Sequence, residues 1–254
     1  LSNMLKTLRD GHVNLTAPFN RSRYWDWYLN APDNYDQYLL ERHYFKDEQQ
    51  YIGSFTVMDF GDVGYIHYES FSDAVDEDAL DIILEQFKDH KGLIFDVRNN
   101  FGGSLSNVYT LGARFAKNGN AVALQKQKNG RGHNDFTDYD SLRFTPTESI
   151  SFTKPIVVLT NRKTYSAGTF FSTLMQALPH VTVMGDRTGG GGGAPAFTEL
   201  TNGWTLRVST TQLFTLNEFN VEDGLFPDIK VDNLDTDIAE NRDRILETAL
   251  EHLR

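Results

Sequence analysis

The chain has 254 residues, 39% of them hydrophobic, and can therefore bury the core of one domain, with or without a small appendage. Its formal net charge of −11 argues against nucleic acid as a partner, because phosphate groups require a basic surface. It has no cysteine and no apolar run long enough to span a bilayer, so we expect neither disulfides nor a membrane span.

The N-terminal segment, residues 1–54, differs in composition from the rest of the chain. It begins inside a predicted helix without the regions of a signal peptide, which suggests a mature or trimmed fragment. His12 follows in the motif Asp-Gly-His-Val, where a polar residue at a strand edge is its simplest interpretation. Residues 19–51 are rich in aromatic side chains, which either pack the segment against the main sheet, the favoured interpretation, or form a cap over substrate.

From residue 55 onward, short apolar strands alternate with amphipathic helices. The order is β, β, α, then β, α, β, β and again β, α, with helices predicted at residues 76–89, 104–117, 167–178 and 236–253. This alternation is typical of an α/β sheet covered by helices, so we take residues 55–254 as the core domain. His67 falls on one face of a predicted strand with Tyr65 and Glu69, which favours packing or surface exposure.

A predicted strand at residues 92–97 passes into a turn that contains Gly102 and Gly103. Paired glycines let the backbone approach a substrate and turn its N–H groups outward, as an oxyanion hole requires. An isolated Gly-Gly pair is more often a plain tight turn.

Ser166 lies at the corner between the predicted strand 155–160 and the helix that begins at Ala167. A hydroxyl at this position experiences the positive end of the helix dipole and the free N–H groups of the first turn, which suits a nucleophile. Serine is also a favoured helix N-cap, so the corner alone does not prove catalysis.

The remaining signals concern phosphate and metal binding. Residues 189–193 are all glycine, but no Gly-Lys-Ser/Thr follows, so we interpret them as a mobile loop beside the serine helix and not as a P-loop. No histidine pair has metal-ligand spacing, and we predict no metal and no cofactor.

Four segments together resemble peptidase family S41, the serine peptidases that include the C-terminal processing proteases and the core of tricorn protease. They are LRDGHV (8–13), DVRNNFGG (96–103), TNRKTYSAG (160–168) and VEDGLFPDI (221–229), in the family's order and rough spacing. The resemblance implies a ClpP/crotonase-like core with repeated ββα units, preceded here by the short aromatic-rich N-terminal segment.

The resemblance also implies roles for individual catalytic residues. The processing-protease branch pairs its serine with a downstream lysine, but no lysine occurs between Lys163 and Lys230. The tricorn-like branch uses an upstream histidine, which His12 matches, and an imidazole with an ordinary pKa near 6.5 can accept the seryl proton at neutral pH. We therefore expect acyl-enzyme chemistry with Ser166 as nucleophile and His12 as base.

Further roles follow from the same resemblance. Glu222 matches the carboxylate that orients the histidine, with its neighbour Asp223 as the alternative, and Gly102 or Gly103 together with Ala167 would supply the oxyanion hole. The tricorn branch has a serine directly before its histidine, where this chain has Gly11. Too few residues separate His12 from the core for the PDZ domain of the processing proteases.

The expected substrate is a peptide or an unfolded protein, in an extracytoplasmic location in a bacterium, either the periplasm or the cell envelope; oligomerisation is left open. Two rival functions share the fold. One is a catalytically decayed S41-like module that binds peptides or other ligands. The other is a crotonase-type acyl-CoA enzyme, which needs no serine nucleophile.

Overall fold

A seven-stranded sheet forms the centre of the molecule, which the computed structural model describes over residues 2–254; Leu1, where the predicted N-terminal helix begins, lies outside this range. The strand order is β14-β10-β9-β6-β5-β4-β3, parallel from β14 to β5 and antiparallel from β5 to β3. The strands are β3 (Gln50–Ile52), β4 (Phe55–Asp59), β5 (Val63–His67), β6 (Gly92–Asp96), β9 (Ile156–Thr160), β10 (Val181–Gly185) and β14 (Ile229–Lys230). The sheet confirms the expected α/β class.

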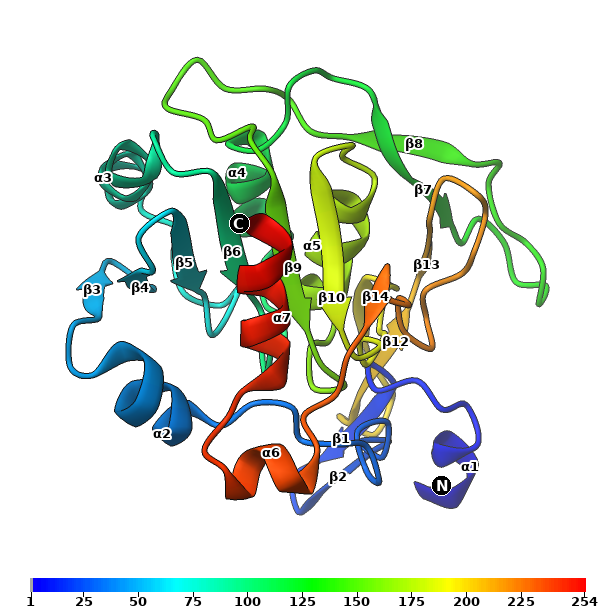
Figure 1. Cartoon of the computed structure of the whole chain (residues 1–254). Coiled ribbons are helices and arrows are strands. Elements are labelled where there is room, and N and C mark those ends of the chain that lie inside the picture. Colours follow the sequence, from blue (N-terminus) through cyan, green and yellow to red (C-terminus); the bar gives the residue numbers. More distant parts are fainter. Residues whose placement is uncertain (1) are drawn as a thin grey trace.

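Helices cover both faces of this sheet (Figure 1). On one face lie α3 (Glu77–Phe87), α4 (Leu105–Ala113) and α5 (Ala167–Gln176), and on the other lie α7 (Arg244–Leu253) and the π-type helix η1 (Leu40–Phe45). The central strand β9 serves both cores, because Val158 packs with the first set of helices and Val157 with the second. A strand buried on both faces requires a continuous apolar sequence, which is what residues 156–159 provide.

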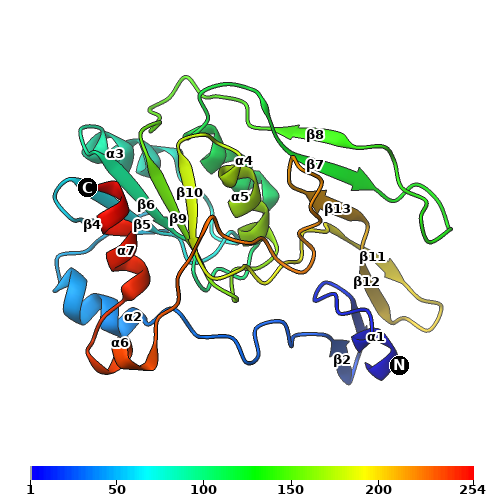
Figure 2. The ribbon, with the colours of Figure 1, turned by 45° about the vertical axis from the view of Figure 1, so that its right-hand side comes forward.

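Two smaller sheets lie beside the central one, as Figure 2 shows. One has the order β11-β12-β1-β2, the other β13-β7-β8. Their strands are β1 (Asn14–Ala17), β2 (Asn20–Arg23), β7 (Ala121–Gln127), β8 (Asp140–Arg143), β11 (Pro195–Glu199), β12 (Thr205–Ser209) and β13 (Thr211–Phe214). Because β1 pairs with β12, the N-terminal segment is hydrogen-bonded to a strand almost 200 residues later, with Asn14 opposite Arg207.

The predicted helices at 76–89, 104–117 and 167–178 correspond to α3, α4 and α5. The predicted helix at 236–253 is wrong in one respect, since it is divided into α6 (Asp235–Ala239) and α7. Asn241 adopts a left-handed backbone with φ 58°, and Asp243 then caps α7 by accepting a 3.0 Å hydrogen bond from Leu246 N–H. The Asp243 carboxylate also pairs with the buried Arg98, an interaction that helical periodicity cannot indicate.

Two short helices complete the N-terminal segment: α1 (Ser2–Lys6) and the single turn α2 (Gln37–Leu39), which leads into η1. Leu5 of α1 packs with Val13 and Leu15 in a small cluster on one face of the four-stranded sheet. Within the described residues, every helix is either too short or too polar to cross a membrane.

Candidate active site

Ser166 occupies the turn between β9 and α5 in a backbone conformation that side chains rarely adopt, with φ 54° and ψ −118°. Such a conformation costs of order 1–3 kcal/mol and persists only where the surroundings enforce it. Two hydrogen bonds do so here: Ser166 N–H donates to the carbonyl of Gly190, and the Ser166 carbonyl accepts from Phe170 N–H. The Ser166 side chain makes no capping hydrogen bond to the helix, so its hydroxyl is available for another partner.

That partner is His12, whose Nε2 lies 2.8 Å from Ser166 Oγ. The imidazole is buried, and its backbone is held on both sides: His12 N–H donates to Asp10 Oδ1 at 2.7 Å, and Asn14 Nδ2 donates to the His12 carbonyl at 2.8 Å. Burial lowers the pKa of His12 to about 4, with Asp10 raising it and Arg207 lowering it to smaller extents. The ring is therefore neutral at pH 7 and able to accept a proton.

The other ring nitrogen, His12 Nδ1, makes no hydrogen bond to any described residue. Glu222 makes no hydrogen bond to the imidazole, and its Oε2 instead accepts a 3.1 Å hydrogen bond from Gly193 N–H. Burial raises the pKa of Glu222 to about 8, with Asp10 adding to the shift. A backbone group of Gly193 in turn raises the pKa of His12, so this one glycine lies against both side chains. Asp223, the alternative to Glu222, is exposed.

The Gly-Gly turn after β6 packs directly against Ser166. A Cβ atom on Gly102, where φ is +97°, would lie 2.7 Å from Ser166 Cβ, so only glycine fits. Gly102 N–H donates to Asn100 Oδ1 at 2.9 Å, whereas the N–H groups of Gly103 and Ala167 have no acceptor among the described residues. Two free donors therefore lie beside the serine.

A cavity of about 150 Å³ opens in front of Ser166. Leu105 and Phe170 provide apolar lining, and Arg207 is the one cation that the described chain places in it. Neither the sequence motifs nor their spacing indicated Arg207, because only the pairing of β12 with β1 brings it to the site.

The glycine loop 189–193 is packed into the site beside Ser166. Its mobility stays a prediction. Gly189 N–H donates to the carbonyl of Thr164, and Gly191 N–H donates to the carbonyl of Glu222. A Cβ atom on Gly190 would collide with the Glu222 carbonyl. These glycines allow three backbone segments to approach one another closely, and they form a wall of the cavity.

The aromatic N-terminal segment reaches the site through Trp27, which stacks on Tyr165 with ring centroids 4.1 Å apart. Tyr165 in turn lies 5.1 Å from the His12 ring. A Cβ atom on Gly11 would lie 2.5 Å from the Tyr165 hydroxyl, so these rings occupy the space that a serine before His12 would need. These contacts place Trp27 of the aromatic segment against the site.

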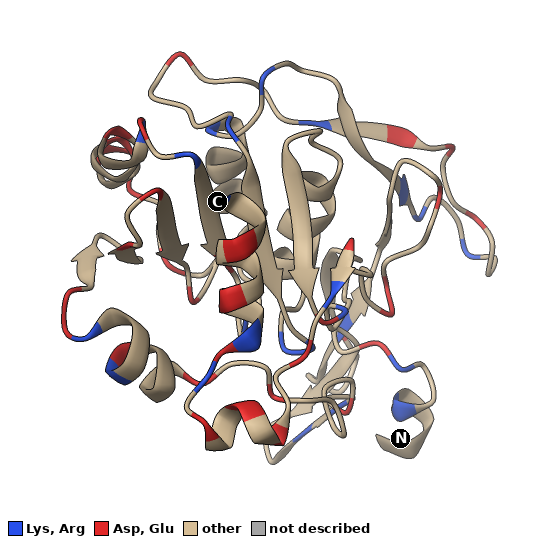
Figure 3. Cartoon of the chain, viewed as in Figure 1, with Lys and Arg blue, Asp and Glu red and all other residues tan. Residues whose placement is uncertain are grey.

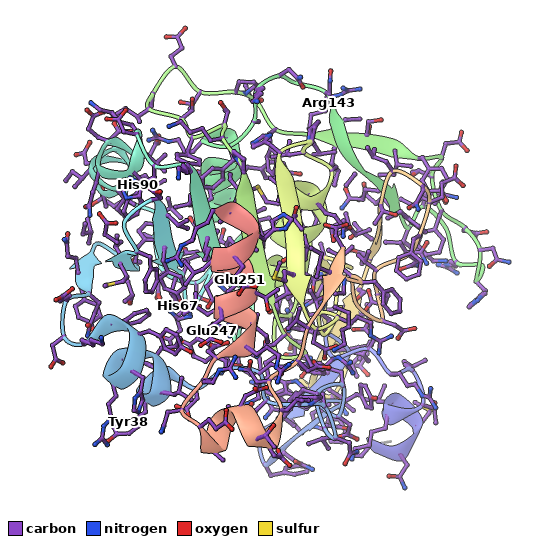
Figure 4. All side chains as sticks on the ribbon, in the orientation of Figure 1. Tyr38, His67, His90, Arg143, Glu247 and Glu251 are labelled. Atoms are coloured by element: carbon purple, nitrogen blue, oxygen red, sulfur yellow. The ribbon has the colours of Figure 1, made fainter. Side chains whose placement is uncertain are left out.

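The competing residues from the sequence lie elsewhere. Lys163 forms an ion pair with Asp33. His67 is buried at the end of β5, where Figure 4 labels it, and stacks on Tyr35 at 5.2 Å. Across residues 2–254, no group of three or more His, Cys, Asp or Glu side chains is arranged to hold a metal ion.

Comparison with known proteins gives consistent matches. The model of peptidase family S41 matches residues 62–231, more than half of the chain. The carboxy-terminal processing protease CtpA of Bacillus subtilis is 26% identical over 181 residues, which cover 70% of this chain and 37% of that protein. A tricorn protease homolog of Saccharolobus solfataricus is 25% identical over 224 residues, covering 85% of this chain and 19% of that protein.

A solved structure of a protein from Parabacteroides merdae, described as a candidate peptidase, superimposes with a TM-score of 0.93. It is 40% identical to this chain, and the match covers 99% of this chain and 80% of that one. The chain thus spans about four fifths of this solved structure but well under half of either curated relative.

Proposed function

Because the chain belongs to peptidase family S41, we propose that it is a serine-type endopeptidase that hydrolyses peptide bonds through an acyl-enzyme. The observation that carries this proposal is the 2.8 Å contact between His12 Nε2 and Ser166 Oγ, at a strained corner beside two free N–H groups. Acyl transfer requires a nucleophile, a neutral base within hydrogen-bond distance of it, and unpaired donors beside the same cavity as the nucleophile.

In this mechanism Ser166 Oγ attacks the scissile carbonyl while His12 Nε2 accepts its proton. The C–N bond then breaks as the imidazolium returns that proton to the leaving amine, and water repeats the sequence to release the acyl group. The low pKa of His12 keeps the base neutral, and it makes the imidazolium a strong acid toward the amine.

The N–H groups of Gly103 and Ala167 are proposed as the oxyanion hole, because both lack an acceptor. Gly102 N–H is already engaged by Asn100, so the proposed contribution of Gly102 is its lack of a Cβ atom, which lets the turn approach Ser166. Removing one donor of such a pair typically costs about 10²–10³ in rate.

Glu222 is proposed as a positioning residue that acts through Gly193. Its carboxyl group is anchored to Gly193 N–H, and the backbone of Gly193 lies against the imidazole. Asp223 is the less favoured alternative because it is exposed.

Several broader features belong to the same proposal. The succession β4, β5, α3 is consistent with a ββα unit of a ClpP/crotonase-like core. Residues 1–54 would then carry the base and pack aromatic side chains against a core of residues 55–254. We propose a peptide or unfolded-protein substrate and, from the bacterial origin of the CtpA relative, an extracytoplasmic location.

The test is cleavage of casein by the unmodified chain and by its Ser166→Ala and His12→Ala variants. If Ser166 and His12 act as one catalytic unit, removing either side chain should reduce the rate of cleavage to a similar extent. Lys163→Ala serves as the matched control, because it removes the nearest lysine in sequence and should leave activity intact. Loss of activity in Lys163→Ala with survival in His12→Ala would contradict the proposed base.

A catalytically decayed peptide-binding module is the alternative, and the intact contact between Ser166 and His12 disfavours it. A serine-directed phosphonate distinguishes the two. We expect labelling of Ser166 in the unmodified chain, little in His12→Ala and none in Ser166→Ala. Absence of labelling, with peptide binding retained by all three proteins, would favour the decayed module.

A further inference from the structure

Arg207 of β12 lies between two cavities. It lines the cavity of about 150 Å³ that contains Ser166, and it also lines a neighbouring cavity of about 210 Å³. The second cavity extends over β1, β2, β11 and β12, with Arg21 and Phe197 in its walls. A peptide whose scissile bond lies at Ser166 can therefore pass the guanidinium of Arg207 as it leaves the first cavity.

The guanidinium of Arg207 has no counterion in the described part of the chain. No carboxylate lies within ion-pair distance, and the buried Nε makes no hydrogen bond. Asp10 contributes an attractive charge, but its two oxygens already accept from His12 N–H and Ser209 Oγ. The guanidinium is partly buried and its charge is unpaired, so a carboxylate bound in either cavity would find a cation with which it can pair.

The strand register places further cations on the same face of this sheet. Asn14 lies opposite both Arg207 and Arg23, and Thr16 lies opposite Arg21, so the three arginines share one face. The opposite face carries the apolar cluster around Leu15. The molecule as a whole is acidic, with Asp and Glu spread over α3, α6 and α7 (Figure 3), so this basic face is local.

We propose that Arg207 binds the side-chain carboxylate of an Asp or Glu in the substrate, close to the scissile bond, with Arg21 supporting the same charge from the second cavity. The inference rests on the proposed peptidase function and adds a substrate preference to it. A guanidinium and a carboxylate can form two parallel hydrogen bonds, which makes the pair both strong and selective.

The experiment uses fluorescence-quenched peptides that are amidated at the C-terminus, so that no α-carboxylate can contribute. In each pair of peptides a Glu replaces a Gln at one position on either side of the scissile bond. The readout is the Glu/Gln ratio of kcat/KM, which cancels any general effect of a substitution on activity. The variants are Arg207→Gln and Arg21→Gln, with Arg143→Gln on the distant strand β8 as the matched control; Figure 4 labels Arg143.

We expect one position at which the unmodified chain prefers Glu by roughly tenfold. That ratio should fall toward one in Arg207→Gln, fall in part in Arg21→Gln, and remain unchanged in Arg143→Gln. An unchanged ratio in Arg207→Gln, or a ratio near one at every position in the unmodified chain, would overturn the inference.

Failure of the proposed function would look different, because no peptide would then be cleaved by any variant. The same peptides are therefore also tested for binding to Ser166→Ala by fluorescence anisotropy. Tighter binding of the Glu peptide that disappears when Arg207→Gln is added would support the carboxylate site even without cleavage. Equal binding of both peptides would reject it.

Discussion

At the scale of single residues, Gly11 shows how one missing side chain shapes the site. The family resemblance expects a serine before the histidine, but Tyr165 and Trp27 fill the space that its Cβ atom would need. The backbone beside His12 is therefore packed against aromatic rings, and no additional hydroxyl can join the contact between His12 and Ser166.

Substituting Gly11→Ser should therefore destabilise the protein and displace His12. We expect a loss of about 1–3 kcal/mol, as for other overpacked sites, together with a larger loss of peptidase activity. Urea denaturation and peptide cleavage measure the two effects. Gly119→Ser is the control, since a Cβ atom there would meet nothing closer than 3.9 Å. Equal losses of stability and of peptidase activity in Gly11→Ser and Gly119→Ser would show that Gly11 is not crowded.

Glu222 should make stability depend on pH. Burial raises its pKa from 4.5 to about 8, so between these values the native state retains a proton that the unfolded state has lost. The contribution of Glu222 to the free energy of unfolding is fully present below pH 4.5, and it is lost as the pH rises toward 8.

The Glu222→Gln variant should therefore gain stability over the unmodified chain as the pH rises. We expect a relative gain on the order of 2–4 kcal/mol between pH 5 and pH 8.5, measured as free energies of unfolding in urea. The exposed neighbour provides the control, because Asp223→Asn should show no such trend. A constant difference between Glu222→Gln and the unmodified chain would mean that Glu222 ionises normally.

At the scale of elements, the turn after β6 must bring its backbone close to two other segments. Gly103 has φ +147°, and a Cβ atom there would collide with the backbone of Phe71 and Ser72. Ser104 N–H donates a 2.9 Å hydrogen bond to the Phe71 carbonyl, which holds the turn against the segment of Phe71 and Ser72. The turn therefore depends on glycine for both its conformation and its packing.

Substituting Gly103→Ala should disrupt this turn and reduce cleavage at least 10²-fold, as for loss of an oxyanion donor. Gly203→Ala is the control that separates backbone strain from steric crowding. Gly203 also has a positive φ, +77°, but an added Cβ atom there would have no neighbour within 4 Å. We expect Gly203→Ala to retain activity. If Gly103→Ala cleaved peptides as fast as the unmodified chain, the proposed oxyanion hole would be contradicted.

At the scale of the whole molecule, Arg98 ties distant parts of the chain together. Its fully buried guanidinium pairs with Asp96 of β6 at 2.6 Å and with Asp243 at the start of α7 at 2.7 Å. It also donates to the carbonyl of Asn34 in the N-terminal segment. The central sheet, the last helix and the first 54 residues thus meet at one side chain.

Substituting Arg98→Met should destabilise the fold by about 3–5 kcal/mol, because two buried carboxylates lose their counterion. The exposed Arg143→Met change removes a comparable side chain without burying a charge, and it should be nearly neutral. Urea denaturation compares the two. A loss below about 1 kcal/mol in Arg98→Met would mean that the carboxylates find other partners or take up protons.

Much of the architecture could be predicted because it depends on local patterns. Apolar runs such as residues 156–159 indicate buried strands, and helical periodicity located α3, α4 and α5. The motifs around Gly102 and Ser166 mark strand-to-helix turns, where backbone geometry already restricts which residues fit. The final helix shows the limit, because a buried pair with Arg98 decides where α7 begins.

The sequence by itself determined the α/β class, the family resemblance and a set of candidate residues, because each depends on neighbours in the chain. Only the tertiary structure decided that His12 and Ser166, 154 positions apart, lie within hydrogen-bond distance. It also decided that Glu222 meets Gly193 instead of the imidazole, and that Arg207 lines the cavity. These contacts follow from the pairing of β1 with β12 and from the close packing that glycine permits, and neither leaves a signal in the local sequence.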